Sequence, residues 1–302
     1  MWKVNVFAGS PLDRAGHRRA DAAWLAERLT DPGSRFLPVW RARNLVTLGE
    51  PVAAIRLGAA TAAALLAEGA SAVFLGIEGA TAHFALDLSH LEESAVRALE
   101  GAVEPADLWA IGGTLARDEA ALLAHARALV TWHQRHRFCG ACGQPTESRE
   151  AGHVRACANP TCGAVHFPRT DPAVIMLVTY GERCLLGRQK SWPDPVYSTL
   201  AGFVEPGESL EEAVAREVME EVGVPLGDIA YHSSQPWPFP LSMMIGFTAV
   251  AATDRLVIDG SEIADARWLT RAEVRGHAAL GFRLPRLHSI ARQLVEHWLA
   301  AG

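Results

Sequence analysis

The stretch GFVEPGESLEEAVAREVMEEVGV, residues 202–224, constrains the fold and the chemistry of this chain more than any other. Gly202 and Gly207 bracket a tight loop in which a proline fixes φ. Ser209 is a candidate N-cap, and Glu212 three residues later completes a capping box. The pattern therefore predicts a glycine-bounded loop that leads into an α-helix.

The predicted helix concentrates carboxylates on one side. At 100° per residue, Glu217, Glu220 and Glu221 fall within an arc of about 100°. No lysine is interleaved with them, so we expect carboxylates without counter-charge, one of which Arg216 could orient. Converging carboxylates favour hard divalent cations such as Mg²⁺ or Mn²⁺. An ordinary acidic helix is the alternative for the glutamates alone, but the preceding loop and the spacing favour a metal site.

Four cysteines predict a second metal site. Cys139 and Cys142 form CGAC, Cys157 and Cys162 form CANPTC, and fourteen residues separate the two pairs. Two close pairs on two turns are typical of a tetrahedral zinc–thiolate site, with disulfides or an Fe–S cluster as alternatives. Four thiolates leave no open coordination position, so we expect this zinc to be structural. Cys184 lies in an apolar run and is expected to be a buried small hydrophobe.

Length and composition suggest a globular chain of about two domains. There are 302 residues, of which 49% are hydrophobic and 21% charged. No run of about 18 uncharged apolar residues occurs, which argues against a membrane span. The first residues show no secretory signal, and we therefore expect a cytoplasmic protein.

Charge is unevenly distributed along the chain. The formal net charge is −6, which argues against a protein that coats nucleic acid. Between residues 127 and 169, however, six arginines stand against Glu147 and Glu150, a local charge of +4. The arginines are Arg127, Arg135, Arg137, Arg149, Arg155 and Arg169. The stretch is either solvated surface or a guide for a nucleic acid strand.

The order of predicted elements divides the chain. The first 130 or so residues alternate strand-like pieces, such as AVFLGIE, with Ala-rich helical pieces, and they present no nucleophile, ligand cluster or phosphate loop. We expect them to form a support or dimerisation unit. After Pro168, strands and helices intermix over about 130 residues, which predicts a mixed sheet with helices on its faces. The sequence shows no internal repeat.

The segment SQPWPFPLSMM, residues 234–244, carries two large rings between three prolines. Proline lacks an N–H and fixes φ, so we expect an extended, stiff loop rather than a central strand or a helix. Trp237 and Phe239 then either fill a hydrophobic gap or meet a flat ligand.

The carboxylate helix and its loop resemble the Nudix box, Gly-x₅-Glu-x₇-Arg-Glu-U-x-Glu-Glu-x-Gly-U with U apolar. The fixed positions are matched by Gly202, Glu208, Arg216, Glu217, Val218, Glu220, Glu221, Gly223 and Val224. The resemblance implies a hydrolase of nucleoside diphosphates linked to another group, folded as an α/β/α sandwich around a mixed sheet. With the four-cysteine module before the box and SQPWPFP-x-S after it, residues 130–295 resemble the NADH pyrophosphatase (NudC) family. That family splits NAD(H) into NMN(H) and AMP, and bacterial members also remove NAD caps from RNA 5′ ends.

The resemblance also implies roles for individual residues. Glu217, Glu221, the carbonyl of Ala201 and the distal Glu262 would bind the catalytic Mg²⁺ or Mn²⁺, with Glu220 beside them, and Glu220 or Glu221 would act as the base. Substrate contacts are implied at Gln235, Pro236, Trp237, Pro238, Phe239, Pro240, Leu241, Ser242 and Ala291. Phe167 stands where some members have a substrate-stacking tyrosine, so the ring is kept and the hydroxyl is lost. The second cysteine pair has four intervening residues in place of the two found in some members.

We therefore predict three parts: an N-terminal α+β domain over 1–133, a zinc ribbon over 134–167 and a Nudix domain over 168–302. The predicted reaction is metal-dependent hydrolysis of the NAD(H) diphosphate by a homodimer. Removal of NAD caps from RNA is one alternative. A dinucleotide-sensing module without enzymatic activity is another.

Overall fold

A computed structural model describes residues 4–47, 49–99, 103–192, 195–258 and 260–302. The chain divides into two compact units, and each is described here by itself. The C-terminal unit comprises Met1–Val6, Asp171–Pro236 and Ser242–Gly302, and the N-terminal unit comprises Phe7–Thr170 and Trp237–Leu241. The short segment that carries Trp237 and Phe239 therefore belongs to the N-terminal unit.

The C-terminal unit is built on a mixed sheet of order β13-β14-β10-β11-β15, with β12 paired to β10. Strand β10 runs parallel to β14 and antiparallel to β11 and β12, and β11 runs antiparallel to β15. The strands are β10 (Asp171–Tyr180), β11 (Arg183–Gln189), β12 (Leu200–Phe203), β13 (Leu226–Trp237), β14 (Ser242–Ala251) and β15 (Ile263–Thr270).

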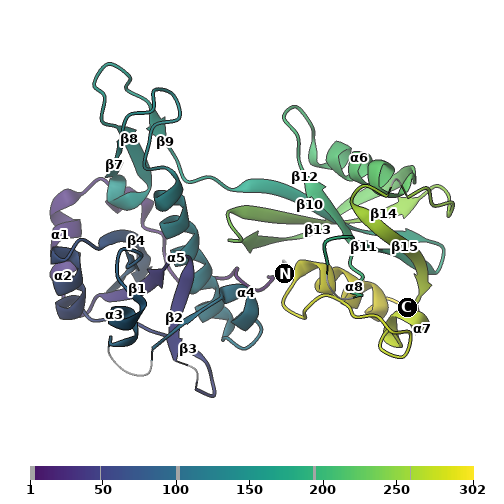
Figure 1. Cartoon of the computed structure of the whole chain (residues 1–302), viewed down its shortest axis with the longest axis horizontal. Coiled ribbons are helices and arrows are strands. Elements are labelled where there is room, and N and C mark those ends of the chain that lie inside the picture. Colours follow the sequence, from purple (N-terminus) through teal and green to yellow (C-terminus); the bar gives the residue numbers. More distant parts are fainter. Residues whose placement is uncertain (1–3, 48, 100–102, 193–194, 259) are drawn as a thin grey trace. The chain divides into compact units, whose positions relative to one another are not determined.

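Helices cover both faces of this sheet. Helix α6 (Leu210–Val222) lies on one face and α8 (Ile290–Ala300) on the other, while α7 (Arg271–Arg275) follows β15 (Figure 1). Because side chains alternate along a strand, Val174 and Met176 of β10 pack with the α6 face. Ile175 and Leu177 pack with the α8 face. The α/β/α sandwich is thereby confirmed.

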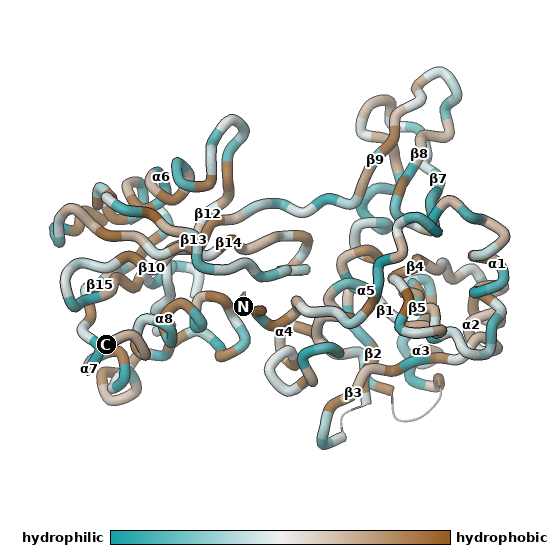
Figure 2. The backbone as a smooth tube through the Cα atoms, turned by 180° about the vertical axis from the view of Figure 1, so that it is seen from behind, coloured by the Kyte–Doolittle hydropathy of each residue, from teal (hydrophilic) through white to brown (hydrophobic). Residues whose placement is uncertain are grey.

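The apolar stripe of α6 fixes how the helix sits on the sheet. Val214 and Val218 are fully buried against β10, and Leu210 packs at the edge of the same cluster. In Figure 2 the helix alternates between hydrophobic and hydrophilic segments. Glu211, Glu212 and Glu220 of the same helix are exposed.

Strand β13 was not anticipated, and the expectation of a loop from Ser234 onward is wrong at its start. The strand continues to Trp237, and the connection to β14 spans only the next four residues. β13 lies at the end of the sheet order, and an edge strand tolerates a proline such as Pro236. Its sequence, LGDIAYHSSQPW, is largely polar, which is why periodicity did not reveal it.

The N-terminal unit has its own mixed sheet, of order β3-β2-β1-β5-β4 with β6 paired to β2. Its strands are β1 (Arg35–Trp40), β2 (Arg43–Thr47), β3 (Ala53–Ala54), β4 (Ser71–Glu78), β5 (Thr81–Asp87) and β6 (Glu104–Ala106). Its helices are η1 (Gly16–Arg18), α1 (Ala22–Thr30), α2 (Ala59–Ala67), α3 (Glu93–Arg97), α4 (Leu108–Ile111) and α5 (Arg117–Arg135).

The two sheets share the strand order of their main path, although β3 pairs with β2 whereas β12 pairs with β10. The path β4-β5-β1-β2-β6 corresponds to β13-β14-β10-β11-β15, and the parallel pair is β5 with β1 in one and β14 with β10 in the other. Helix α2 follows β3 as α6 follows β12, but its sequence is AATAAALLA and carries no carboxylate. The repeat is one of topology, and the residues that bear chemistry occur in one copy only.

Strands β7 (Thr146–Arg149), β8 (Val154–Cys157) and β9 (Val165–His166) form a small sheet, with η2 (Glu150–Gly152) between the first two. His133 of α5 joins this sheet to the helix. Its Nε2 lies 2.8 Å from the carbonyl of Gly152, and its Nδ1 lies 2.8 Å from a guanidinium nitrogen of Arg155. Since arginine only donates, His133 must be neutral, with its proton on Nε2.

None of the helices in the described ranges is both long enough and apolar enough to cross a bilayer.

Candidate active site and metal centre

Local sequence sets the start and the end of α6. The Oγ of Ser209 accepts from the backbone N–H of Glu212, and the Glu212 carboxylate accepts from the N–H of Ser209. The predicted capping box is therefore present. Gly223 ends the helix with φ of 67°, the left-handed conformation that glycine adopts without strain. The helix register is fixed from both ends.

Gly202 and Glu217 bring β12 and α6 into direct contact. A Cβ atom placed on Gly202 would lie 1.9 Å from the carboxyl carbon of Glu217. The glycine is thus required by the neighbouring carboxylate, because any side chain would displace it. Ala201, whose carbonyl the resemblance implies as a ligand, is the preceding residue of β12 and pairs with Ile175 of β10.

Arg216 forms ion pairs with several carboxylates of the α6 region. The expectation of carboxylates without counter-charge is therefore wrong. Its guanidinium donates to both oxygens of Glu208, at 2.6 and 3.0 Å. It also donates to Glu217 and to Glu220, each at 2.9 Å. A further bond of 2.9 Å goes to the carbonyl of Phe203 on β12. Hydrogen bonding to Arg216 lowers the pKa of the Glu208 carboxyl.

The predicted catalytic carboxylates stand in different environments. The side chain of Glu220 is 60% exposed, whereas Glu221 is buried at 4%. Burial raises the pKa of Glu217, Arg216 opposes this, and the charges of Glu220 and Glu262 add to it. Glu262, just before β15, therefore acts on Glu217 electrostatically although the two are far apart in sequence.

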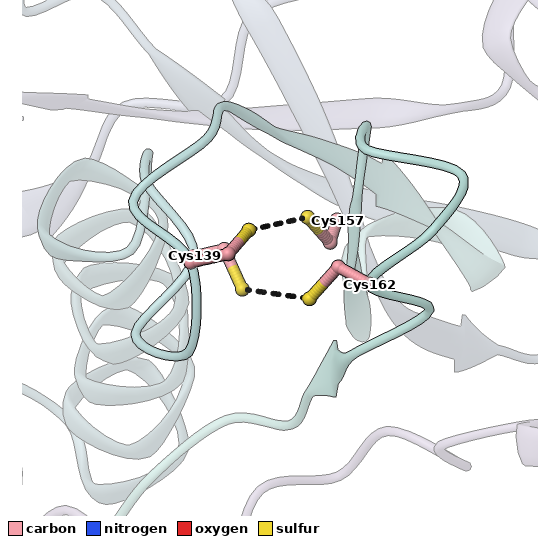
Figure 3. A group of neighbouring side chains, drawn as sticks. Cys139, Cys157 and Cys162 are labelled. Atoms are coloured by element: carbon pink, nitrogen blue, oxygen red, sulfur yellow. Dashed lines mark hydrogen bonds between the residues drawn. The ribbon is translucent and has the colours of Figure 1, made fainter.

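The four cysteines converge as predicted. Their Sγ atoms lie within 4.8 Å of one another, which in the described ranges holds for no other group of three or more His, Cys, Asp or Glu residues. The separation of Cys139 and Cys162 is 3.9 Å, and that of Cys142 and Cys157 is 3.4 Å. Thiolates at about 2.3 Å from a tetrahedral zinc would be about 3.8 Å apart. Figure 3 shows Cys139, Cys157 and Cys162 pointing toward one another from facing loops. The donor set fits zinc.

Backbone geometry supports this centre. Gly143 and Gly163, one residue after each pair, adopt φ of 73° and 63°, the left-handed conformation that glycine takes in tight turns. The backbone N–H of Gln144, with Cys157 next in importance, lowers the pKa of Cys142 to about 7. Cys184 is fully buried in β11, as expected.

Two of the residues implied as substrate contacts meet at the start of α8. The side chain of Gln235 is completely buried, and its Oε1 accepts from the N–H of Ile290 at 2.7 Å. Its Nε2 donates to the carbonyls of Val6 and His288 at 3.0 and 2.8 Å. Ala291, the next residue of α8, is also buried. Both polar atoms of the Gln235 side chain are therefore bonded to backbone groups, at the start of α8, at His288 and at Val6.

Residues 235–242 are called the strip below. Apart from Gln235, they differ in exposure. Pro236, Trp237 and Phe239 are half-buried, Pro238, Leu241 and Ser242 are buried, and Pro240 is exposed. Phe167, which follows the zinc ribbon strands, is 65% exposed. Sequence reasoning gave no role to Phe7 and placed Arg127 only within the basic stretch, whereas both residues contact the strip directly. No spacing rule connects residues so distant in the chain.

Comparison with known families agrees with this geometry. A NUDIX domain matches residues 169–296, an NADH pyrophosphatase zinc ribbon domain matches 134–167, and an NADH pyrophosphatase-like rudimentary NUDIX domain matches 33–132. The last match accords with the shared strand order of the two sheets. The fold and the α6 motif thus define a Nudix hydrolase.

Similar proteins indicate which family of Nudix hydrolases the chain belongs to. The NAD-capped RNA hydrolase NUDT12 of Macaca fascicularis is 37% identical over 98% of this chain and 73% of its own length. The NAD-capped RNA hydrolase NudC of Mycobacterium bovis is 44% identical over 65% of this chain and 66% of its own. That of Stutzerimonas stutzeri is 48% identical over 59% and 62%. The chain belongs to the NADH pyrophosphatase (NudC) family of Nudix hydrolases.

Proposed function

We propose that this protein hydrolyses the diphosphate of NAD(H), releasing NMN(H) and AMP, with Mg²⁺ or Mn²⁺ as the catalytic ion. The observation that carries the proposal is the contact between Glu217 and Gly202, with the charge of Glu262 acting on the same carboxylate. A partly buried carboxylate beside a further carboxylate suits a hard divalent cation. The names of the relatives support a substrate of the NAD type.

Glu217, Glu221, Glu262 and the carbonyl of Ala201 would hold the ion. When bound, the ion would neutralise the diphosphate and lower the pKa of a water molecule. Arg216 keeps the Glu217 carboxylate in one orientation through a hydrogen bond of 2.9 Å. Glu220 or Glu221 would accept the proton of the attacking water. The water oxygen would bond to the phosphorus on the AMP side as the bridging P–O bond breaks.

The experiment that tests this function is incubation of the full chain with NADH, NAD⁺, ADP-ribose and an ADP-sugar, each with Mg²⁺ and Mn²⁺. Chromatography should detect NMNH and AMP from NADH in equal amounts. Glu217→Gln should lose this activity, because it removes the charged carboxylate. Glu211→Gln is a matched control, since Glu211 is an exposed residue on the first turn of the same helix. Absence of AMP from the wild-type protein with either ion would contradict the proposal.

Removal of NAD caps from RNA is a second candidate, favoured by the names of the relatives and by exposed cations near the zinc ribbon. Arg127 and Arg155 of the basic stretch are committed to internal contacts, and Arg149 pairs with Glu147. Arg135 and Arg137 are exposed. Replacing both with glutamine should weaken cleavage of capped RNA and reduce its salt dependence, while leaving NADH cleavage unchanged. Equal effects on both substrates would exclude a role in guiding RNA.

Homodimer formation and a cytoplasmic location stay predictions, which sedimentation of the purified chain and localisation in cells would test. The sensing alternative is disfavoured, because the chain keeps every fixed position of the Nudix box.

A further inference from the structure

The rings of the strip are packed on a third ring from the start of the chain. The centroid of Phe7 lies 6.2 Å from Trp237 and 5.7 Å from Phe239, both in edge-to-face geometry. Trp237 and Phe239 are themselves 5.1 Å apart at an interplanar angle of 74°. Phe7 is 2% exposed, whereas the other two rings are half-buried. Phe7 is thus the buried support, and the strip presents the accessible ring surface.

Arg127 of α5 fixes the strip from a second direction. Its Nε donates to the carbonyl of Pro238 at 2.8 Å, and its guanidinium lies 5.0 Å from the centroid of Phe239. One side chain therefore holds both the backbone and a ring of the strip. Arg127 is half-buried, as expected for an arginine that makes such contacts.

The position of Phe7 is closely determined by its surroundings. Its φ is 71°, which is unusual for a bulky residue and is maintained only where surrounding contacts require it. A Cβ atom on Gly112, at the end of α4, would lie 2.6 Å from the ring of Phe7. The glycine leaves the space that the ring occupies. Three segments far apart in sequence thus fix the two rings of the strip.

We propose that Phe7 and Arg127 are positioning residues, which fix the orientation of Trp237 and Phe239 and so set the affinity for a dinucleotide through its flat rings. The proposal rests on the proposed function, since it assigns the strip to substrate recognition. Neither residue takes part in the chemical step.

The test uses the full chain and NADH. Phe7→Leu and Arg127→Gln should each raise KM about 10-fold, since base stacking contributes ~1–3 kcal/mol. Their kcat should stay within about two-fold of the wild type, because the carboxylate helix is unchanged. Arg127→Lys, which keeps the charge, should lie between wild type and Arg127→Gln. Arg117→Gln is the matched control, an exposed arginine on the first turn of the same helix.

A double-mutant cycle separates positioning from general stability. If Arg127 acts through Phe239, then Arg127→Gln should add no further rise in KM once Phe239→Ala is present. Additive effects, or equal losses in kcat and in kcat/KM, would overturn the proposal. So would a normal KM for Trp237→Ala and Phe239→Ala.

Fluorescence titration of NADH without added divalent ion gives a readout that does not depend on turnover. If the wild-type protein binds NADH in this titration but releases no AMP once Mg²⁺ or Mn²⁺ is added, the proposed reaction fails, and the double-mutant cycle is still measured in Kd. If it does not bind NADH at all, both proposals fail. Gly112→Ala, which would push the Phe7 ring without touching the strip, should raise Kd in the same direction.

Discussion

Gly202 of β12 lies directly against the carboxylate of Glu217 on α6, at a distance that leaves no room for even a methyl group. The contact holds the Glu217 carboxylate beside the backbone of β12. The residue before Gly202 in this strand is Ala201, whose carbonyl is the implied metal ligand. We expect Gly202→Ala to lower kcat about 100-fold, since displacement of a reacting group by about 1 Å has an effect of that size. The protein should stay folded, because the side chain of Glu217 can move outward.

Gly227→Ala provides the control for this change. Gly227 lies on β13 of the same unit, and the nearest atom to a new Cβ is 3.7 Å away. Its activity should match that of the wild type. Normal turnover by Gly202→Ala would show that the position of Glu217 is unimportant for the reaction.

The several contacts of the Arg216 guanidinium predict that lysine cannot replace this residue. Arg216 contacts Glu208 through two nitrogens while also holding Glu217 and Glu220. Lysine offers a single charged centre and cannot bridge these groups in the same geometry. Arg216→Lys should lower kcat and raise the Mg²⁺ concentration that gives half-maximal activity. A variant with an unchanged Mg²⁺ titration would indicate that Arg216 does not orient the carboxylates.

We expect one zinc ion per chain, and we expect the zinc to be lost when a single cysteine of the four is replaced. Cys142→Ser removes one of four converging thiolates, and because metal binding contributes folding free energy, its Tm should fall with its zinc content. Elemental analysis and thermal unfolding measure the two quantities. Cys184→Ala, a fully buried cysteine of β11, should keep its zinc even though it loses some packing. Zinc retention by Cys142→Ser would contradict the four-thiolate assignment.

The stability of the N-terminal unit should depend on pH through His153. Burial lowers the pKa of His153 to about 4, opposed by its bond to the Phe74 carbonyl and aided by the charges of Arg19 and Arg14. Below its usual pKa of about 6.5 the unfolded chain binds a proton that the folded chain does not. The free energy of unfolding should therefore fall between pH 6.5 and pH 4, by roughly 3 kcal/mol from this group.

His153→Gln tests this dependence. Glutamine can still donate to the Phe74 carbonyl but does not titrate, so the fall in stability over this pH range should become smaller. Denaturant unfolding at pH 7 and pH 4.5 measures the difference. An unchanged pH dependence would mean that other groups cause it.

Local patterns were sufficient for the parts of the protein that are local in the chain. The capping box of α6 and the buried Cys184 both follow from short-range patterns. The same reasoning missed β13, because an edge strand with few buried residues lacks apolar alternation. It also missed the shared strand order of the two sheets, because α2 and α6 have unrelated compositions.

The sequence alone determined which groups are available: four thiolates at zinc spacing, a carboxylate helix behind a glycine loop, and two rings between prolines. Tertiary structure decided how each group is held. It placed Gly202 against Glu217, gave Arg216 four partners, and packed Trp237 and Phe239 on Phe7 beside Arg127. The physical reason is that spacing along a chain fixes contacts within a helix or a turn. Contacts between distant segments depend on how sheets and helices pack, which no local pattern encodes.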